Sequence, residues 1–224
     1  LTLAGRTVPG RETVVDLMPW QGGSPTATMA VSPDGKTLYF PICGGTPFRP
    51  AEIMRLSTDG NGVAGRHPLD KSKIGELPEF GDRSHMAISS DGKSLFLSGL
   101  RDRRGKGEPA AIYRLRLPEC TGLDVFFGER GVPGKDATHL GATAGGLASD
   151  GKGSLLVCDT ANNRILVMGE EDGKLKGEMA CDSPWNVGMH RTSGAVYVAS
   201  QGKGGAKLAK FGNWQDAKPV AERP

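Results

Sequence analysis

Short apolar runs separated by polar turns recur along the chain and predict a hairpin that is repeated four times. The clearest copy is MAVSPDGKTLYF, from Met29 to Phe40, in which two apolar runs flank the polar turn SPDG. Three more divergent copies run from Met86 to Leu97, from Gly146 to Val157 and from Val187 to Val198. Two apolar runs joined by a short turn that contains Asp-Gly are the pattern of a β-hairpin.

The spacing of these hairpins predicts a β-propeller. The turn residues Asp34, Asp91, Asp150 and Ser193 are 57, 59 and 43 residues apart. Repeats of about 40 to 50 residues with a strand-turn-strand core are typical of propeller blades, which are four-stranded antiparallel sheets. The run after each turn is apolar at consecutive positions, which predicts a strand covered on both faces by neighbouring blades. We therefore expect an all-β propeller of four-stranded antiparallel blades, with about four blades in this chain.

The remaining strands are less clear. Residues 52–56, 111–115, 164–168 and 207–211 alternate between apolar and polar and predict a half-exposed third strand in each unit. Fourth strands have weaker patterns, and none is predicted after Phe211, whereas Leu1 to Gly5 read as an outer strand ahead of the first hairpin. We treat residues 1–224 as a single propeller domain or propeller segment. Its expected blade cores lie near 28–57, 85–127, 144–179 and 186–211.

The extra strand at the start has two explanations. Either the two ends of the chain meet to complete the last blade and close a four-bladed ring, or the chain is a segment of a six- to eight-bladed propeller. Four units of about 56 residues fit the first explanation. Six to eight blades are the commoner sizes, and the missing initiator Met suits a fragment, so we favour the second.

Composition narrows the function only slightly. The 28 Lys and Arg residues nearly balance the 25 Asp and Glu residues, a balance that does not indicate a nucleic-acid or membrane binder. No apolar run reaches the roughly 18 residues that span a bilayer. Four cysteines, at 43, 120, 158 and 181, lack the spacing of a zinc site. They could pair in an oxidising compartment, although Cys158 lies in an apolar strand and reads as a small buried side chain. We expect an extracellular or periplasmic location.

The third unit resembles the NHL repeat. Its segment DTANNRI, from Asp159 to Ile165, is a close match to the repeat's Asp-Thr-x-Asn-Asn-Arg-Ile hallmark within a similarity of about 23 residues. The first two units look more like the Ser-Pro-Asp-Gly-Lys hairpins of TolB-like and lactonase-like propellers. These resemblances imply the propeller fold but no single activity, because such propellers serve as enzymes, RNA readers and protein-binding platforms. In NHL units the residues that match Asp159 and Arg164 tie adjacent strands together.

The enzyme branches of these families have signatures that this chain lacks. Gluconolactonase-like propellers hold a divalent metal with an acidic and amide cluster, commonly with Pro-Asn-Gly before a hairpin. Here Thr26-Ala27-Thr28 and Arg83-Ser84-His85 stand at that place. The amidating-lyase branch binds zinc through several axial histidines, and only His85 occupies such a position.

Candidate ligand contacts lie at the axial ends of the innermost strands. His85 follows Asp82 and Arg83, and an imidazole there would face the central channel as a ligand contact or general base. Trp185 and Asn186 hold the equivalent place in the last unit, where a ligand could pack on the aromatic ring. The alternatives are a strand-end histidine bonded to backbone and a tryptophan that fills the gap between blades.

A second candidate is a basic loop that would suit a phosphate or an acidic partner. The alternative is a solvated run of charge. The loop contains Arg101, Arg103, Arg104 and Lys106.

Two functional hypotheses from different classes follow. The first is a non-catalytic binding or scaffold module that recognises a protein or an extracellular ligand through its loop face, with a protein or the remaining blades of a larger chain as its partner. The second is a propeller enzyme of lactonase or lyase type, in which Asp82, His85 and Asn186 would converge on a divalent metal near the axis. RNA binding, as in some NHL proteins, is disfavoured by the near-neutral charge.

Overall fold

The structure of the protein is a computed structural model that describes residues 28–42, 52–58, 63–68, 79–101 and 110–224. Within these residues the strands form four antiparallel sheets of four strands each, and each sheet uses four strands that are consecutive in the chain. We call the sheets blades 1 to 4. Blade 1 contains β1 (Ala30–Val31), β2 (Thr37–Ile42), β3 (Glu52–Ser57) and β4 (Val63–Pro68), and blade 2 contains β5 (Glu79–Ile88), β6 (Ser94–Arg101), β7 (Ala111–Arg116) and β8 (Thr121–Gly128). Blade 3 contains β9 (Ala144–Ser149), β10 (Ser154–Asp159), β11 (Arg164–Gly169) and β12 (Leu175–Ala180), and blade 4 contains β13 (Pro184–Met189), β14 (Val196–Gly202), β15 (Gly205–Phe211) and β16 (Ala221–Arg223).

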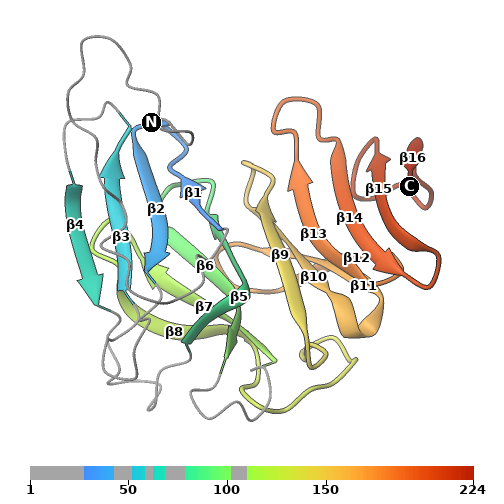
Figure 1. The fold of residues 1–224 in the computed structure, drawn as a ribbon, viewed down its shortest axis with the longest axis horizontal. Coiled ribbons are helices and arrows are strands. Elements are labelled where there is room, and N and C mark those ends of the chain that lie inside the picture. Colours follow the sequence, from blue (N-terminus) through green and yellow to red (C-terminus); the bar gives the residue numbers. More distant parts are fainter. Residues whose placement is uncertain (1–27, 43–51, 59–62, 69–78, 102–109) are drawn as a thin grey trace.

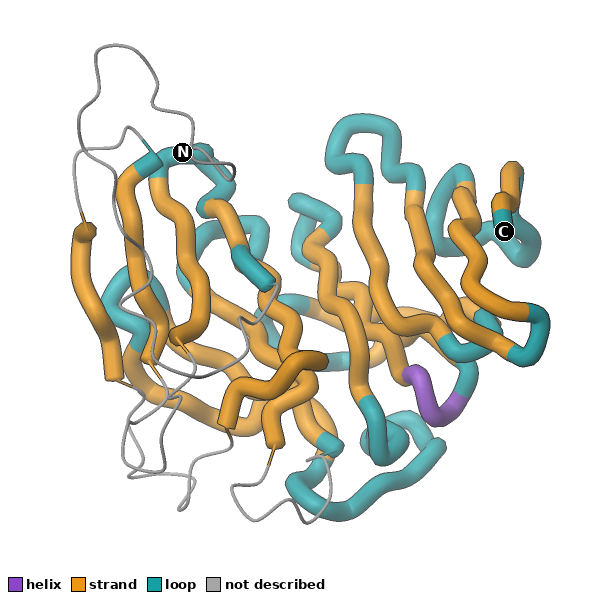
Figure 2. Tube along the Cα trace, viewed as in Figure 1, coloured by secondary structure: helices purple, strands orange, loops and turns teal. Residues whose placement is uncertain are grey.

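The blades follow one another around a common centre (Figure 1). The first strand of each blade lies innermost, and β5 contacts β1 and β9, which in turn contacts β13. Figure 2 shows that the described connections are loops and turns apart from one helical turn, η1 (Thr160–Asn162). The predicted all-β propeller of four-stranded antiparallel blades is therefore confirmed.

Apolar clusters between neighbouring blades hold the propeller together. One cluster joins blades 1 and 2, a second joins blades 2 and 3, and a third joins blades 3 and 4. A fourth cluster, around Leu38, Met54 and Leu56, lies within blade 1. Within the described ranges no apolar cluster joins blade 4 to blade 1. We call the face of a blade that points to the next blade its outgoing face, and the opposite face its incoming face.

The central strands of blade 3 are buried on both faces, which the continuous apolar run predicted for β10. Every residue of β10 and β11 is buried, because blade 2 covers one face of blade 3 and blade 4 covers the other. The prediction is wrong for Tyr197 in β14, which is 38% exposed. Tyr197 lies on the outgoing face of blade 4, which no other described blade covers.

Two further predictions about strands are corrected. The third strand β11 is not half-exposed, since consecutive residues such as Ile165 and Leu166 pack on opposite neighbouring blades. Blade 4 does not lack a fourth strand, because β16 pairs with β15 through Lys210 and Ala221. The expected outer strand at residues 1–5 lies outside the described residues.

The recurrent SxDG turn has a clear structural role. In the second hairpin the Ser89 hydroxyl donates to the Asp91 carboxylate over 2.6 Å and accepts from the Ser94 amide over 2.9 Å. Gly92 follows with a φ of 73°, a left-handed conformation that glycine adopts without steric cost. The first hairpin repeats this pattern with Ser32 and Asp34. The motif therefore closes hairpins and fixes their register.

A pair of equivalent positions tests how much stability depends on coverage by a neighbouring blade. Ile165 pairs with Cys158 in blade 3, and Leu208 pairs with Ala199 at the same position of blade 4. Ile165 is fully buried, whereas Leu208 is 52% exposed. We expect Ile165→Ala to lower the free energy of unfolding by about 2–5 kcal/mol and Leu208→Ala to change it by less than about 0.5 kcal/mol. Denaturant unfolding measures both values, and equal losses would contradict the assigned coverage.

Candidate functional site

The inner strands of blades 2, 3 and 4 place three residues at the same level of the propeller. Strand register aligns Met86, Leu147 and Val187, which pair with Leu97, Val157 and Val198 of the second strands. The residues before them are His85, Gly146 and Asn186. The predicted equivalence of His85 with the Trp185-Asn186 position is therefore confirmed.

His85 and Trp185 form an edge-to-face pair across blade 3. Their ring centroids are 6.1 Å apart and the ring planes are inclined by 88°. This geometry is attractive because the positive edge of one ring meets the negative face of the other. Trp185 is 47% exposed, so much of its ring surface is open. Two of the five predicted ligand-contact residues thus lie side by side, although 100 residues separate them in the chain.

Two glycines in β9 let the neighbouring backbones approach closely at this level. A Cβ atom on Gly145 would lie 2.6 Å from the Trp185 carbonyl oxygen, and one on Gly146 would lie 2.7 Å from the Asn186 Cα. Any other residue would force β9 and β13 apart. This contribution was not predicted, and the signal that could have revealed it is the Gly145-Gly146 pair at the position where blade 2 has Ser84-His85.

The electrostatic environment of His85 favours a neutral imidazole. Burial lowers the pKa of His85, since desolvation disfavours the charged form. Its Nε2 atom is buried and has no hydrogen-bond partner in the described part of the chain. Buried polar atoms of this kind are rare in folded proteins and gain free energy from any group that completes their hydrogen bonding. His85 is therefore suited to exchange a hydrogen bond with a ligand without carrying a charge.

The other residues predicted to form the site lie in different places in the structure. Asn186 is exposed, and its side-chain oxygen accepts from the Val187 amide over 2.9 Å. Asp82 and Arg83 lie within β5 and not in a loop before it, because β5 starts at Glu79, which pairs with Arg101 at the end of β6. Arg101 of the predicted basic loop is thus a strand residue, and Arg103, Arg104 and Lys106 lie outside the described residues.

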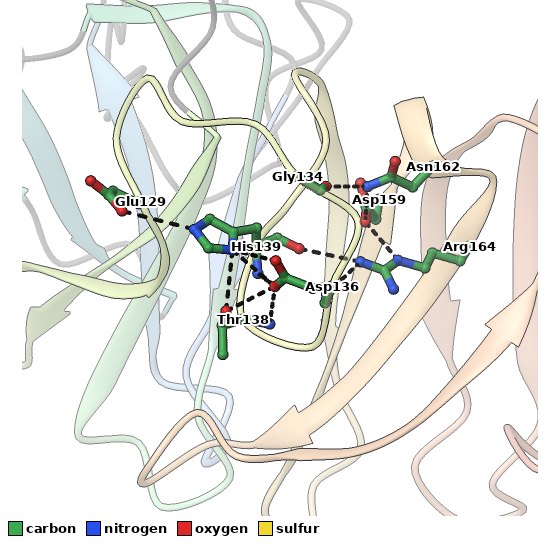
Figure 3. A network of polar contacts seen from close by, with 8 residues as sticks. All are labelled: Glu129, Gly134, Asp136, Thr138, His139, Asp159, Asn162 and Arg164. Atoms are coloured by element: carbon green, nitrogen blue, oxygen red, sulfur yellow. Dashed lines mark hydrogen bonds and ion pairs between the residues drawn. The ribbon is translucent and has the colours of Figure 1, made fainter.

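The residues of the NHL-like segment form a polar network that is structural, as expected (Figure 3). Asp159 is fully buried and accepts from the Arg164 Nε over 2.8 Å, from Asn162 over 2.8 Å and from the Gly141 amide over 2.8 Å. Arg164 also donates to Glu178 on β12 over 3.0 Å. The pair therefore links β10, β11, β12 and the loop that enters blade 3.

The same loop is held by a histidine and an aspartate. Asp136 contacts the Nδ1 of His139 over 2.8 Å and accepts from the Thr138 hydroxyl over 2.8 Å (Figure 3). The hydrogen bond to Asp136 raises the pKa of His139. Carbonyl oxygens of Asp136 and His139 accept from Arg164, so the loop is attached to the buried ion pair.

A groove between blades 2 and 3 is a further concave feature, at the end of the strands where the SxDG turns lie. Its volume is about 770 Å³. Glu170 in its wall is buried and accepts from the Ser90 amide over 2.7 Å through one oxygen, while its Oε1 has no partner among the described residues. Serines and four basic side chains also line the groove: Ser89, Ser90, Ser94, Lys93, Arg114, Arg116 and Lys176.

The described cysteines are unpaired. Cys120, Cys158 and Cys181 are free thiols, and Cys43 lies outside the described residues. Cys158 is fully buried, as its place in an apolar strand predicted. Desolvation raises the pKa of Cys120 to about 12 and also raises the pKa of Cys158, so neither thiol is set up as a nucleophile.

The described residues contain no group of three or more His, Cys, Asp or Glu side chains that could hold a metal ion. No helix in the same part of the chain is long and apolar enough to cross a bilayer.

Removing Arg164 should be costly, because it leaves the Asp159 carboxylate buried and without its cation. We expect Arg164→Ala to lower the free energy of unfolding by about 3–5 kcal/mol. Lys174→Ala is the control, since it breaks an exposed ion pair with Asp172 and should cost less than about 1 kcal/mol. Denaturant unfolding measures both, and a small loss at Arg164 would show that the network is not structural.

The two histidines should titrate on opposite sides of the ordinary histidine pKa of about 6.5. His85 should titrate below it. The unfolded chain then binds the proton more readily, so His85 reduces stability as the pH falls below about 6.5. His139 should titrate above it, so its contribution is fully present below about pH 6.5 and is lost as the pH rises through its folded pKa. NMR of the imidazole protons measures both, and Asp136→Asn should lower only the His139 value. A His85 pKa above 6.5 would contradict its burial.

Comparisons with known proteins support the fold. No protein-family model matches the chain, and no curated protein matches its sequence. A structure of Kuenenia stuttgartiensis hydrazine synthase is similar over 97% of this chain and 52% of that one, with 13% identity and a TM-score of 0.55. The Dos1 propeller is similar over 87% of this chain and 46% of that one, with 7% identity and a TM-score of 0.54.

A chain of the mitotic checkpoint complex is similar over 88% of this chain and 50% of its own length, with 10% identity and a TM-score of 0.51. The chain thus spans about half the length of the structures that it matches. The comparisons do not confirm the finer resemblance to NHL-repeat, TolB-like or lactonase-like families. At these identities the likeness shows the fold alone, and that fold is a β-propeller.

Proposed function

We propose that the protein is a non-catalytic binding module that recognises a peptide segment of a protein partner through the axial site around His85 and Trp185. The observation that carries this proposal is the contact between these two rings. It joins a half-exposed aromatic surface to a neutral imidazole with an unpartnered Nε2. Recognition sites usually consist of an apolar and aromatic surface that contains a small number of polar groups.

The chemistry of the site favours binding over catalysis. Trp185 offers ring surface to an apolar or aromatic side chain, Asn186 offers an exposed amide, and His85 offers one hydrogen bond. Peptide segments supply both apolar side chains and main-chain hydrogen-bonding groups, and tryptophan is enriched among residues that dominate binding energy. A chain of the mitotic checkpoint complex, whose fold is similar, is part of a protein assembly. An extracellular or periplasmic location and an NHL-like or lactonase-like ancestry belong to the same proposal.

Selection of a phage-displayed random peptide library on the full chain tests the proposal. Peptides that bind the axial site should lose at least about tenfold in affinity, or about 1.4 kcal/mol, on Trp185→Ala and on His85→Ala. His190→Ala is the matched control, because His190 is exposed in the turn after β13 and bonds Ser193. Failure to enrich any peptide, or affinities that survive Trp185→Ala, would contradict the proposal.

The same variants separate binding from the alternative of a lactonase- or lyase-type enzyme. That alternative needs a divalent metal near the axis. Stoichiometric metal in the purified protein that is lost on His85→Ala, but kept on His190→Ala, would support the enzyme and overturn the binding module.

A further inference from the structure

We propose that the outgoing face of blade 4, formed by Tyr197, Leu208 and Lys210, is a docking face for a further four-stranded propeller blade. The occupant has an aliphatic incoming face, as blade 3 does, and an acidic turn between its third and fourth strands. Strand register places these three side chains on the same face of the blade. Tyr197 pairs with Lys210, and Leu208 lies two residues before Lys210 on β15.

The outgoing faces of blades 1 and 2 carry the same set of side chains. In blade 1 the aromatic residue Tyr39 pairs with the cation Arg55, and in blade 2 Phe96 pairs with Arg114. An isoleucine stands two residues before each arginine, Ile53 in blade 1 and Ile112 in blade 2. Blade 4 repeats this set of aromatic, aliphatic and cationic residues. In blade 3 the corresponding pair is Leu156 and Val167.

In blades 1 and 2 these side chains form the contact with the next blade. Ile53 and Tyr39 are buried in the cluster that joins blades 1 and 2, and Ile112 and Phe96 are buried in the cluster that joins blades 2 and 3. The equivalent Tyr197 and Leu208 are 38% and 52% exposed. The outgoing face of blade 4 thus has the composition of a blade interface without a described partner.

The cation makes a specific contact in the interface between blades 1 and 2 and in the interface between blades 2 and 3. The Arg55 Nη1 donates to the Pro118 carbonyl oxygen over 3.1 Å, and Pro118 lies in the turn between the third and fourth strands of blade 2. The Arg114 Nη1 donates to the Glu171 carbonyl oxygen over 3.0 Å, in the same turn of blade 3. Lys210 instead lies over the ring of Tyr197, at 5.8 Å from its centroid. A docked blade would give Lys210 the turn carbonyl that both arginines have.

Charge also identifies the occupant. The turn that receives Arg55 contains Glu119, and the turn that receives Arg114 contains Glu170, Glu171 and Asp172. An acidic turn is therefore what a blade should offer to Lys210. The first blade of a second copy is not a free occupant, because Leu38, Met54 and Leu56 on its incoming face are already buried.

A fusion protein tests the proposal with the full chain. A second copy of residues 144–180, which form blade 3, is joined after Pro224 through a Gly-Ser linker of about 10 residues. Such a linker spans roughly 17 Å, which exceeds the roughly 14 Å across a four-stranded blade. Blade 3 is the probe because blade 2 already receives it through Phe96, Ile112 and Arg114.

Docking should protect the appended blade from proteolysis, and the protection should depend on the face. We expect Leu208→Glu to speed cleavage within the appended segment at least about tenfold and Lys210→Ala to speed it less. Val125→Glu is the matched control, because Val125 is 42% exposed on β8 of blade 2. Lys174→Ala, made only in the original blade 3 and not in the appended copy, is the control for the lysine. Neither control should change the cleavage rate.

Two results would overturn the proposal. One is an appended blade that is cleaved equally fast with and without Leu208→Glu. The other is a dimer of the unfused chain, seen by sedimentation equilibrium, that Leu208→Glu dissolves, because it would make a second copy the occupant of this face.

Discussion

Burial of the central strands between adjacent blades is the interaction on which the rest of the structure depends. A four-stranded sheet with apolar side chains on both faces cannot bury both by itself, so each blade needs a neighbour on either side. In blade 3 this condition is met, since Leu155 and Val157 pack toward blade 2 while Leu156 and Cys158 pack toward blade 4. The two ends of the series differ in this respect. Blade 1 has a buried cluster of its own on its incoming face, and blade 4 has an exposed outgoing face.

This dependence explains which parts of the fold could be predicted from sequence. Hairpins with SxDG turns are local, so their strands and their period were predictable from the pattern alone. Continuous apolar runs correctly indicated coverage on both faces for Leu155 to Val157, but the same pattern at Val196 to Val198 did not, because coverage depends on a neighbour that the run does not encode. The start of β5 at Glu79 was missed for a similar reason, since it is set by pairing with Arg101 and not by local composition.

The axial site shows how much of a site can be predicted from the alignment of the hairpins alone. Aligning the hairpins was enough to place His85 and Trp185-Asn186 at equivalent positions. It could not show that the two rings touch, because blade 3 stands between them in the chain, and the contact depends on the close approach that Gly145 and Gly146 allow. Non-adjacent blades converge near the axis, so a site there combines residues from distant repeats. Its geometry should therefore respond to the spacing of the blades and not only to the residues that line it.

The third strands show that one position can specify two kinds of blade interface. Where the strand carries an arginine, as at Arg55 and Arg114, the next blade presents an acidic turn and a main-chain carbonyl. Where it carries Val167, the corresponding turn of blade 4 supplies Trp214, which packs on the apolar cluster between blades 3 and 4 and lies over Gly177. An arginine facing Trp214 would exchange the carbonyl acceptor for a cation–π contact with the ring, and a valine facing an acidic turn would leave the turn carbonyl without the arginine donor. Each third strand is therefore matched to the chemistry of the turn that it meets, and a single position can distinguish one blade interface from another.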